Sequence, residues 1–278
     1  MATKKRCPKG TRRNKKTGNC EKNITQKISP KSKSNSRNTH SPSPFPLDSI
    51  IKIQKWFRGC IFRLHRMPII MYVLQKFLKS QAFIFSKKNE DGRINSSLDE
   101  DDIIQLLVKK FGDRIKKSKP RMWHDILAFD YMYGWLTINI KTTTTRTSDN
   151  IGNLAVCVHA YTNEVLDINK SYENGIMSVH LYNKLKNKEY NQNNKKDYYF
   201  LVLNKTDGTD VIVNSLKGLT NLTPNVNNLP FQVCWNKNRI FTYKNIKQNI
   251  KKFIDCLQKS KPSYIEIFMS NIRQLKLD

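Results

Sequence analysis

The residues with the greatest capacity for chemistry are a carboxylate, an amide and an ammonium group near the centre of the chain. Asp125 begins one apolar stretch, and Asn139-Ile140-Lys141 lies in the next. Both stretches are predicted to be β-strands, and residues i and i+2 of a strand lie on the same face. On adjacent strands, Asp125 would therefore face both Asn139 and Lys141 across the sheet.

Two predicted strands and a helix would position this group. The strands cover 125–131 and 135–142 and are joined by a short link, which is compatible with a hairpin. In the second strand, Leu136, Ile138 and Ile140 alternate with polar residues. A helix is predicted before them at about 98–115, with acidic residues in its first turn and lysines later, as the helix dipole favours.

The remainder of the chain continues this mixture of helices and strands. A helix is predicted from a cap at Ser148 or Asp149, and two strands, 198–203 and 210–215, flank an Asp207-Gly208 turn. Further helices are predicted near 244–258 and 262–275. The expected fold class is α/β, with a mixed central β-sheet flanked by helices.

The central residues resemble the PD-(D/E)xK nuclease superfamily and, more narrowly, type II restriction endonucleases, over about residues 95–278. His124-Asp125 stands in place of Pro-Asp, and Asn139-Ile140-Lys141 in place of the (D/E)xK triplet. The resemblance implies a restriction-endonuclease-like fold and Mg²⁺ bound by Asp125, Asn139 and the backbone carbonyl of Ile140. Lys141 would position or deprotonate the attacking water, and cleavage would leave a 5′-phosphate and a 3′-hydroxyl.

Asn139 departs from the pattern of this superfamily. An amide oxygen can coordinate Mg²⁺, but it brings one negative charge fewer than a carboxylate. A relocated carboxylate would compensate, and the candidates are Glu100 on the preceding helix and Glu164 on the following one. If neither reaches the metal, the fold would bind DNA without cutting it. An Asp and an Asn-x-Lys on neighbouring strands also occur by chance, with Lys141 an ordinary solvated strand end.

Two segments are candidates for DNA contact. The hydroxyls and the arginine of "TTTTRTS", directly after Lys141, suit phosphate contact. The loop 218–235 is rich in Asn and Thr; asparagine can pair with adenine, although these residues also simply make turns. The predicted DNA-contacting residues are Thr142, Thr143, Thr144, Arg146, Asn221, Asn225 and Asn227.

The charge of the chain predicts a polyanionic partner. The net charge is +28, and residues 1–80 contribute +18 of it, from 20 Lys and Arg against Glu21 and Asp48. Nucleic acid is the first candidate partner and an anionic membrane surface the second. No stretch approaches the ~18 apolar residues of a membrane span, and scattered cysteines suit a reducing compartment. Cys7 and Cys20 could form a disulfide or half of a metal site.

A second motif lies in the basic N-terminal region. Ile53, Gln54, Arg58, Gly59 and Arg63 reproduce IQxxxRGxxxR, the full IQ motif, which resembles the binding site for calmodulin and myosin light chains. The alternative is an ordinary cationic helix that lies on DNA or on the nuclease body. The basic arm followed by such a helix is similar to N-terminal modules of large eukaryotic DNA viruses. That similarity implies the cytoplasm or nucleus of an infected cell, or the virion.

The sequence therefore predicts three parts: a disordered basic arm (1–46), a basic IQ-like helical segment (47–80) and a catalytic domain (81–278). The predicted function is Mg²⁺-dependent, sequence-specific cleavage of double-stranded DNA. The resemblance to type II restriction endonucleases also implies a homodimer, because such enzymes cut palindromic DNA, which is matched by a two-fold protein. The alternative is a catalytically inactive adaptor that binds DNA, or a calmodulin-like light chain, through the same fold and IQ helix.

Overall fold

The computed structural model describes residues 11–13, 20–22, 67–85, 92–151, 153–191, 196–225, 231–243, 245–260, 270–272 and 275. They belong to two compact units, residues 1–52 and 53–278. The IQ motif at 53–63 and Asn227 lie outside the described residues, as does most of the helix predicted at 262–275.

The first unit contains a short antiparallel hairpin. Strand β1 (Thr11–Arg13) pairs with β2 (Cys20–Lys22), with Thr11 opposite Lys22 and Arg13 opposite Cys20. The prediction of a disordered arm is not confirmed at these residues. That prediction rested on the lack of an apolar face, whereas closing a short loop between two strands costs little chain entropy.

A mixed five-stranded sheet forms the centre of the second unit, in the order β3-β4-β5-β7-β8. Its strands are β3 (Ile115–Lys117), β4 (Ile126–Asp130), β5 (Gly134–Thr143), β7 (Tyr198–Asn204) and β8 (Asp207–Ser215). β7 runs parallel to β5, whereas the other neighbours are antiparallel. A parallel pair needs a crossover connection, and helices α4 (Leu154–Tyr161) and α5 (Asn174–Lys186) lie within it. The four predicted strands are confirmed.

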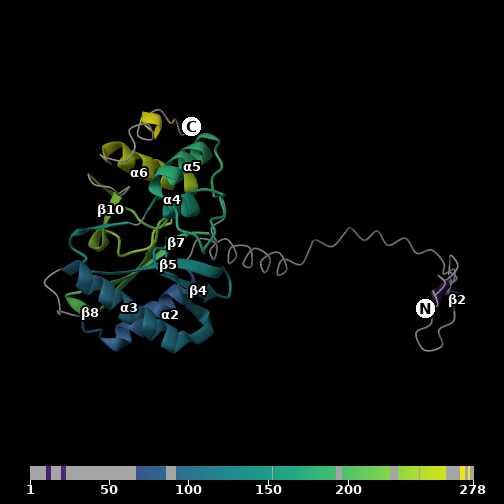
Figure 1. The fold of residues 1–278 in the computed structure, drawn as a ribbon, viewed down its shortest axis with the longest axis horizontal. Coiled ribbons are helices and arrows are strands. Elements are labelled where there is room, and N and C mark those ends of the chain that lie inside the picture. The colour runs from purple at the N-terminus through teal and green to yellow at the C-terminus, as the bar shows by residue number, and fades with distance from the viewer. Residues whose placement is uncertain are drawn as a thin grey trace, which may run out of the picture. The chain divides into compact units, whose positions relative to one another are not determined.

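Helices cover both faces of this sheet (Figure 1). On one face, α2 (Ile69–Gln81) and α3 (Gly92–Phe111) bury their apolar residues against Ile138, Ile140 and Leu201. On the other face, α4, α5 and α6 (Ile246–Lys259) share a core with Phe200 and Val202. The helices predicted at 98–115 and 244–258 are confirmed, but the first both starts and ends earlier, and Ile115 lies in β3. None of the helices in the described ranges is long and apolar enough to cross a membrane.

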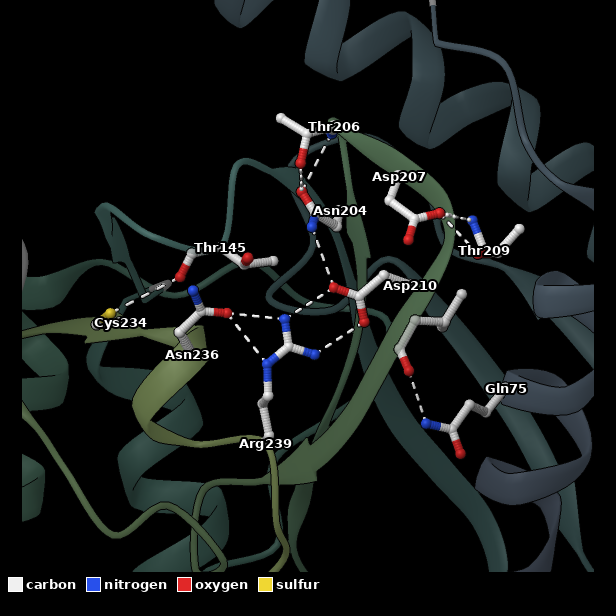
Figure 2. Close-up of polar contacts among 11 residues, drawn as sticks. Gln75, Thr145, Asn204, Thr206, Asp207, Thr209, Asp210, Cys234, Asn236 and Arg239 are labelled. Carbon is white, nitrogen blue, oxygen red and sulfur yellow. Dashed lines mark hydrogen bonds and ion pairs between the residues drawn. The ribbon is translucent and has the colours of Figure 1, made fainter.

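Helix α2 belongs to the sheet domain. Met71, Leu74 and Leu78 are fully buried in the core beneath the sheet. The side-chain amide of Gln75 donates to the carbonyl of Val211 in β8 at 2.7 Å (Figure 2). The sheet domain therefore begins earlier than residue 81, because part of the segment assigned to a basic appendage supplies its core.

A smaller antiparallel sheet corrects one sequence prediction. It has the order β6-β10-β9, formed by β6 (Ser148–Asn150), β10 (Phe231–Cys234) and β9 (Thr223–Pro224). The predicted start of the next helix at Ser148 or Asp149 is wrong, because these residues pair with β10. Helix α4 starts later, where the side chain of Asn153 caps it by accepting from the backbone of Ala155 at 2.9 Å.

Polar contacts hold the β7–β8 hairpin to the segment after β10 (Figure 2). The Arg239 guanidinium donates to both carboxylate oxygens of Asp210 at 2.8 Å, and Asn204 donates to the same carboxylate at 3.0 Å. Gly208, in the first part of β8, lies against Phe83, because a side chain on Gly208 would clash with the Phe83 backbone. The turn itself is formed by Lys205 and Thr206, so the turn predicted at Asp207-Gly208 is wrong by two residues. The hairpin is thus fixed on both sides, at the end where β5 also terminates.

Candidate functional site

Asp125 lies immediately before β4 and reaches across to β5. Its backbone N–H donates to the carbonyl of Ile138 at 3.0 Å. Its Oδ2 accepts two hydrogen bonds, each 2.7 Å long, from the Asn139 amide and from the backbone N–H of Ile140. The structure therefore brings Asp125 and Asn139 together, as the strand pattern predicted.

The backbone of Ile140 faces this carboxylate, while its side chain is fully buried in the core on the α2–α3 side. In an antiparallel pair, the N–H and C=O of one residue point toward the same neighbouring strand. The carbonyl of Ile140 is therefore directed to the same side as its N–H, beyond the start of β4. An oxygen donor is thus available next to Asp125.

Glu100 on α3 reaches the same end of β5. Its Oε1 accepts from the backbone N–H of Thr142 at 3.1 Å. Burial raises the pKa of Glu100 from 4.5 to about 7; the positive charge of Lys141 opposes this rise, and the charge of Asp125 adds to it. Burial also raises the pKa of Asp125, against the Ile140 hydrogen bond and the charge of Lys141. Glu100, Asp125 and Lys141 therefore form one electrostatically coupled group.

Glu164, the other candidate carboxylate, is engaged by α5. It pairs with Lys184 at 3.2 Å and with His180 at 3.3 Å. Although its partial burial works in the opposite direction, the Lys184 hydrogen bond and the charge of His180 lower the pKa of Glu164. Glu100, and not Glu164, is thus the candidate that the structure couples to Asp125.

The predicted DNA-contacting residues divide into structural and accessible ones. Thr142 is buried, and its hydroxyl donates to the carbonyl of Ser96 at 3.3 Å. Asn225 is 1% exposed and donates to the side chain of Asn150 at 3.2 Å, so its predicted role in reading bases is not supported. Thr144 and Arg146 are exposed.

The other two predicted contacts are held by backbone interactions. The carbonyl of Thr143 accepts from the backbone N–H of Lys205 at 2.9 Å. The backbone N–H of Asn221 donates to the side-chain oxygen of Asn238 at 3.0 Å, and the carbonyl of Asn221 accepts from the Asn238 amide at 2.9 Å. Asn221 itself is exposed. The side chain of Asn221 is therefore presented at the surface by a fixed loop.

The oxygen donors at this site fit a hard divalent cation. Across the described ranges, no three His, Cys, Asp or Glu side chains converge as a metal site. The group here combines the carboxylates of Asp125 and Glu100 with the carbonyl of Ile140 and the amide of Asn139. The Asn139 Oδ1 is buried and accepts no hydrogen bond. Carboxylate, amide and carbonyl oxygens are the ligands that such cations take, so the chemistry of this set suits Mg²⁺.

A hollow of about 220 Å³ lies beside His124 and Asp125, and its other lining residues were not predicted from the sequence. Asp101, Lys117, Lys119 and Arg121 line it, and Lys117 pairs with Asp101 at 2.9 Å. The sequence did contain a signal, because a basic run, Lys116 to Arg121, ends three residues before His124. Only the fold shows that this run lies beside the carboxylate.

The chain matches no family model, no curated protein and no solved structure.

Proposed function

We propose that the protein is a Mg²⁺-dependent DNA endonuclease and that its sheet domain has the restriction-endonuclease-like fold. The observation that carries the proposal is the contact of Asp125 with Asn139 and Ile140, coupled to Lys141 and Glu100. The helix before these strands and the helix after them support the resemblance to the PD-(D/E)xK superfamily. The positive charge of the chain suits a DNA substrate.

The residues that would hold Mg²⁺ are Asp125, Glu100, Ile140 through its carbonyl, and Asn139 through Oδ1. When bound, the ion would neutralise charge on the phosphate and lower the pKa of the attacking water. Glu100 supplies the negative charge that Asn139 lacks relative to the family pattern. Its pKa of about 7 means that a nearby cation favours its ionised form at neutral pH.

Asn139 and Lys141 have separate roles in this mechanism. The Asn139 amide donates to Asp125, which fixes the carboxylate and leaves the amide oxygen as a ligand. Lys141 lies on the same face of β5, two residues further along the strand. Its ammonium group orients the attacking water and stabilises the negative charge that develops on the phosphate.

The test is cleavage of long unmethylated duplex DNA by purified protein, with Mg²⁺ or with EDTA. We expect discrete bands from the wild type with Mg²⁺, and none from Lys141→Ala or with EDTA. Glu100→Gln should lose most activity, whereas the matched variant Glu164→Gln should retain it. A smear would refute sequence specificity, and intact DNA would refute the nuclease. Sedimentation of the active species tests the proposed homodimer.

A second candidate is a non-catalytic adaptor, which the Asn139 amide favours because it occupies Oδ2 of Asp125. This protein would shift DNA on a gel without cutting it, or bind a calmodulin-like light chain through the IQ motif. A calcium-dependent pull-down that is lost in Ile53→Glu plus Arg58→Glu would support the light-chain function. Equal retention of that double variant would exclude it.

A further inference from the structure

Part of the β4–β5 surface is not covered by either helical layer. Phe129 and Trp135 belong to neither of the two cores that the described residues form. The centres of their rings lie 5.4 Å apart, and Trp135 is 40% exposed. Tyr131, which is 84% exposed, contacts Phe129 edge-on at 5.7 Å. We call these three residues the Trp135 surface.

Cations surround the Trp135 surface. The Lys116 Nζ lies 4.2 Å from the centre of the Trp135 ring, and the Arg114 guanidinium carbon lies 4.9 Å from that of Tyr131. Exposed aromatic rings beside Lys and Arg are the combination that binds nucleobases together with their phosphates. The surface therefore has both chemical elements of a nucleic-acid contact.

A continuous basic segment connects this surface to the Asp125 site. A hollow of about 350 Å³ lies against Trp135 and Lys116, and the hollow of about 220 Å³ lies beside Asp125. Both hollows are lined by the same residues of one segment: Lys117, Ser118, Lys119, Met122 and His124. The two hollows therefore adjoin along this segment.

The charge of these hollows favours a polyanion over a second copy of the chain. The acids among their lining residues are Asp101 and Asp125, and Lys117 already pairs with Asp101 at 2.9 Å. Lys116, Lys119 and Arg121 add positive charge. A second copy docked through this same surface would place these cations against their own counterparts, so a polyanion is the better occupant.

We propose that the Trp135 surface binds an unpaired DNA strand and that the two hollows lead this strand to the Asp125 site. A base can stack on a protein ring only when its own face is free, which favours an overhang, a flap or an opened duplex. Trp135 and Asn139 are four residues apart on one face of β5, or roughly 13 Å.

The experiment is fluorescence anisotropy with the full chain in EDTA, using a labelled oligothymidine and a blunt duplex of the same length. Trp135→Ala should weaken oligothymidine binding about tenfold, the order expected of one lost stacking contact, and change duplex binding less than about twofold. Trp135→Phe should restore most of the affinity. Tyr72→Ala, an exposed aromatic residue on α2, is the matched control and should change neither.

A salt series separates stacking from charge. Lys116→Ala should lower the slope of log K against log salt for oligothymidine by about 0.7, as expected for one phosphate contact. The matched control is Lys186→Ala, which removes a lysine that lies over Tyr182 on α5 at 5.9 Å and should leave the slope unchanged. An unchanged slope for Lys116→Ala would overturn its assigned contact with the strand.

The inference depends on the proposed nuclease only for what happens to the strand at Asp125, so the two can fail separately. A protein that needs Trp135 for strand binding but cuts nothing with Mg²⁺ would refute the nuclease alone. Equal weakening of both probes by Trp135→Ala, or of neither, would overturn the inference. A wild-type dimer that Trp135→Ala makes monomeric without loss of strand affinity would show a self-interface and also overturn it.

Discussion

Replacing Glu100 with glutamine should stabilise the protein at alkaline pH when no divalent cation is present. Burial raises the pKa of Glu100 from 4.5 to about 7, so the folded state retains a proton that the unfolded chain releases. Glu100 therefore does not lower the free energy of unfolding below pH 4.5. Its destabilising effect grows between pH 4.5 and 7 and is complete above pH 7. At 1.36 kcal/mol per pKa unit, that effect is about 3 kcal/mol.

The substitution isolates charge from packing. Glutamine has nearly the same volume and keeps an oxygen that can accept from the Thr142 N–H, a contact of 3.1 Å. The assay is urea unfolding in EDTA at pH 5 and pH 8. We expect Glu100→Gln to gain up to about 3 kcal/mol over the wild type at pH 8 and little at pH 5. The raised pKa of Asp125 is present in both proteins and largely cancels in the comparison.

Glu164→Gln is the control with the opposite sign. Burial acts to raise its pKa, but the Lys184 hydrogen bond and the charge of His180 together outweigh burial and lower the pKa. Its stabilising effect is present above its unfolded pKa and lost as the pH falls, so this variant should lose stability at neutral pH. Parallel pH dependence of Glu100→Gln and the wild type would refute the assignment of a charged, buried carboxylate at the Asp125 site.

Mg²⁺ binding should show the same titration. A pKa of about 7 leaves Glu100 roughly one-tenth ionised at pH 6 and nine-tenths ionised at pH 8, so the apparent Mg²⁺ affinity should rise about tenfold over that range. Calorimetry in two buffers should detect the released proton. An affinity independent of pH would exclude Glu100 as a ligand.

Three further perturbations test other parts of the structure. Asn139→Asp would replace a 2.7 Å hydrogen bond to Asp125 with a pair of carboxylates, so it should destabilise the metal-free protein by about 1–3 kcal/mol. In a thermal melt, Mg²⁺ should stabilise this variant more than it stabilises the wild type. Equal melting shifts for variant and wild type would contradict this. Leu74→Ala, at a fully buried position of α2, should cost about 2–5 kcal/mol in urea unfolding, and a cost near zero would show that α2 is not part of the core. Deleting residues 1–52 removes 14 Lys and Arg and two acids but leaves α2 in place. The slope of log K against log salt for duplex binding should therefore fall, and an unchanged slope would show that the arm does not contact phosphate.

The strands that carry the site could be predicted from the sequence because their pattern is local. Leu136, Ile138 and Ile140 alternate with polar residues, and this period of two also determines that Asn139 faces the side of the sheet occupied by Asp125. The prediction named both Glu100 and Glu164 as possible second carboxylates. Spacing could not choose between them, because each choice depends on which helix packs at the end of β5.

Elements that depend on distant partners were missed or assigned wrongly. Ser148 and Asp149 resemble a helix cap, yet they form β6, whose partner β10 lies more than 80 positions away. Helix α2 appeared to be the end of a basic appendage because its place in the core depends on β4 and β8. The Trp135 surface was also missed, since exposure of an aromatic residue in a strand depends on which helices cover that part of the sheet.

The packing of α2 on β8 also has a consequence for synthesis on the ribosome. Gln75 and its partner Val211 are 136 positions apart, so a long intervening chain must be made before α2 can complete its core contacts. Contacts of such high sequence separation slow folding. During translation the basic N-terminal residues would be present for many seconds before the sheet domain forms, at about 5–20 residues per second. A nascent chain would thus be exposed to polyanions before its sheet domain has folded.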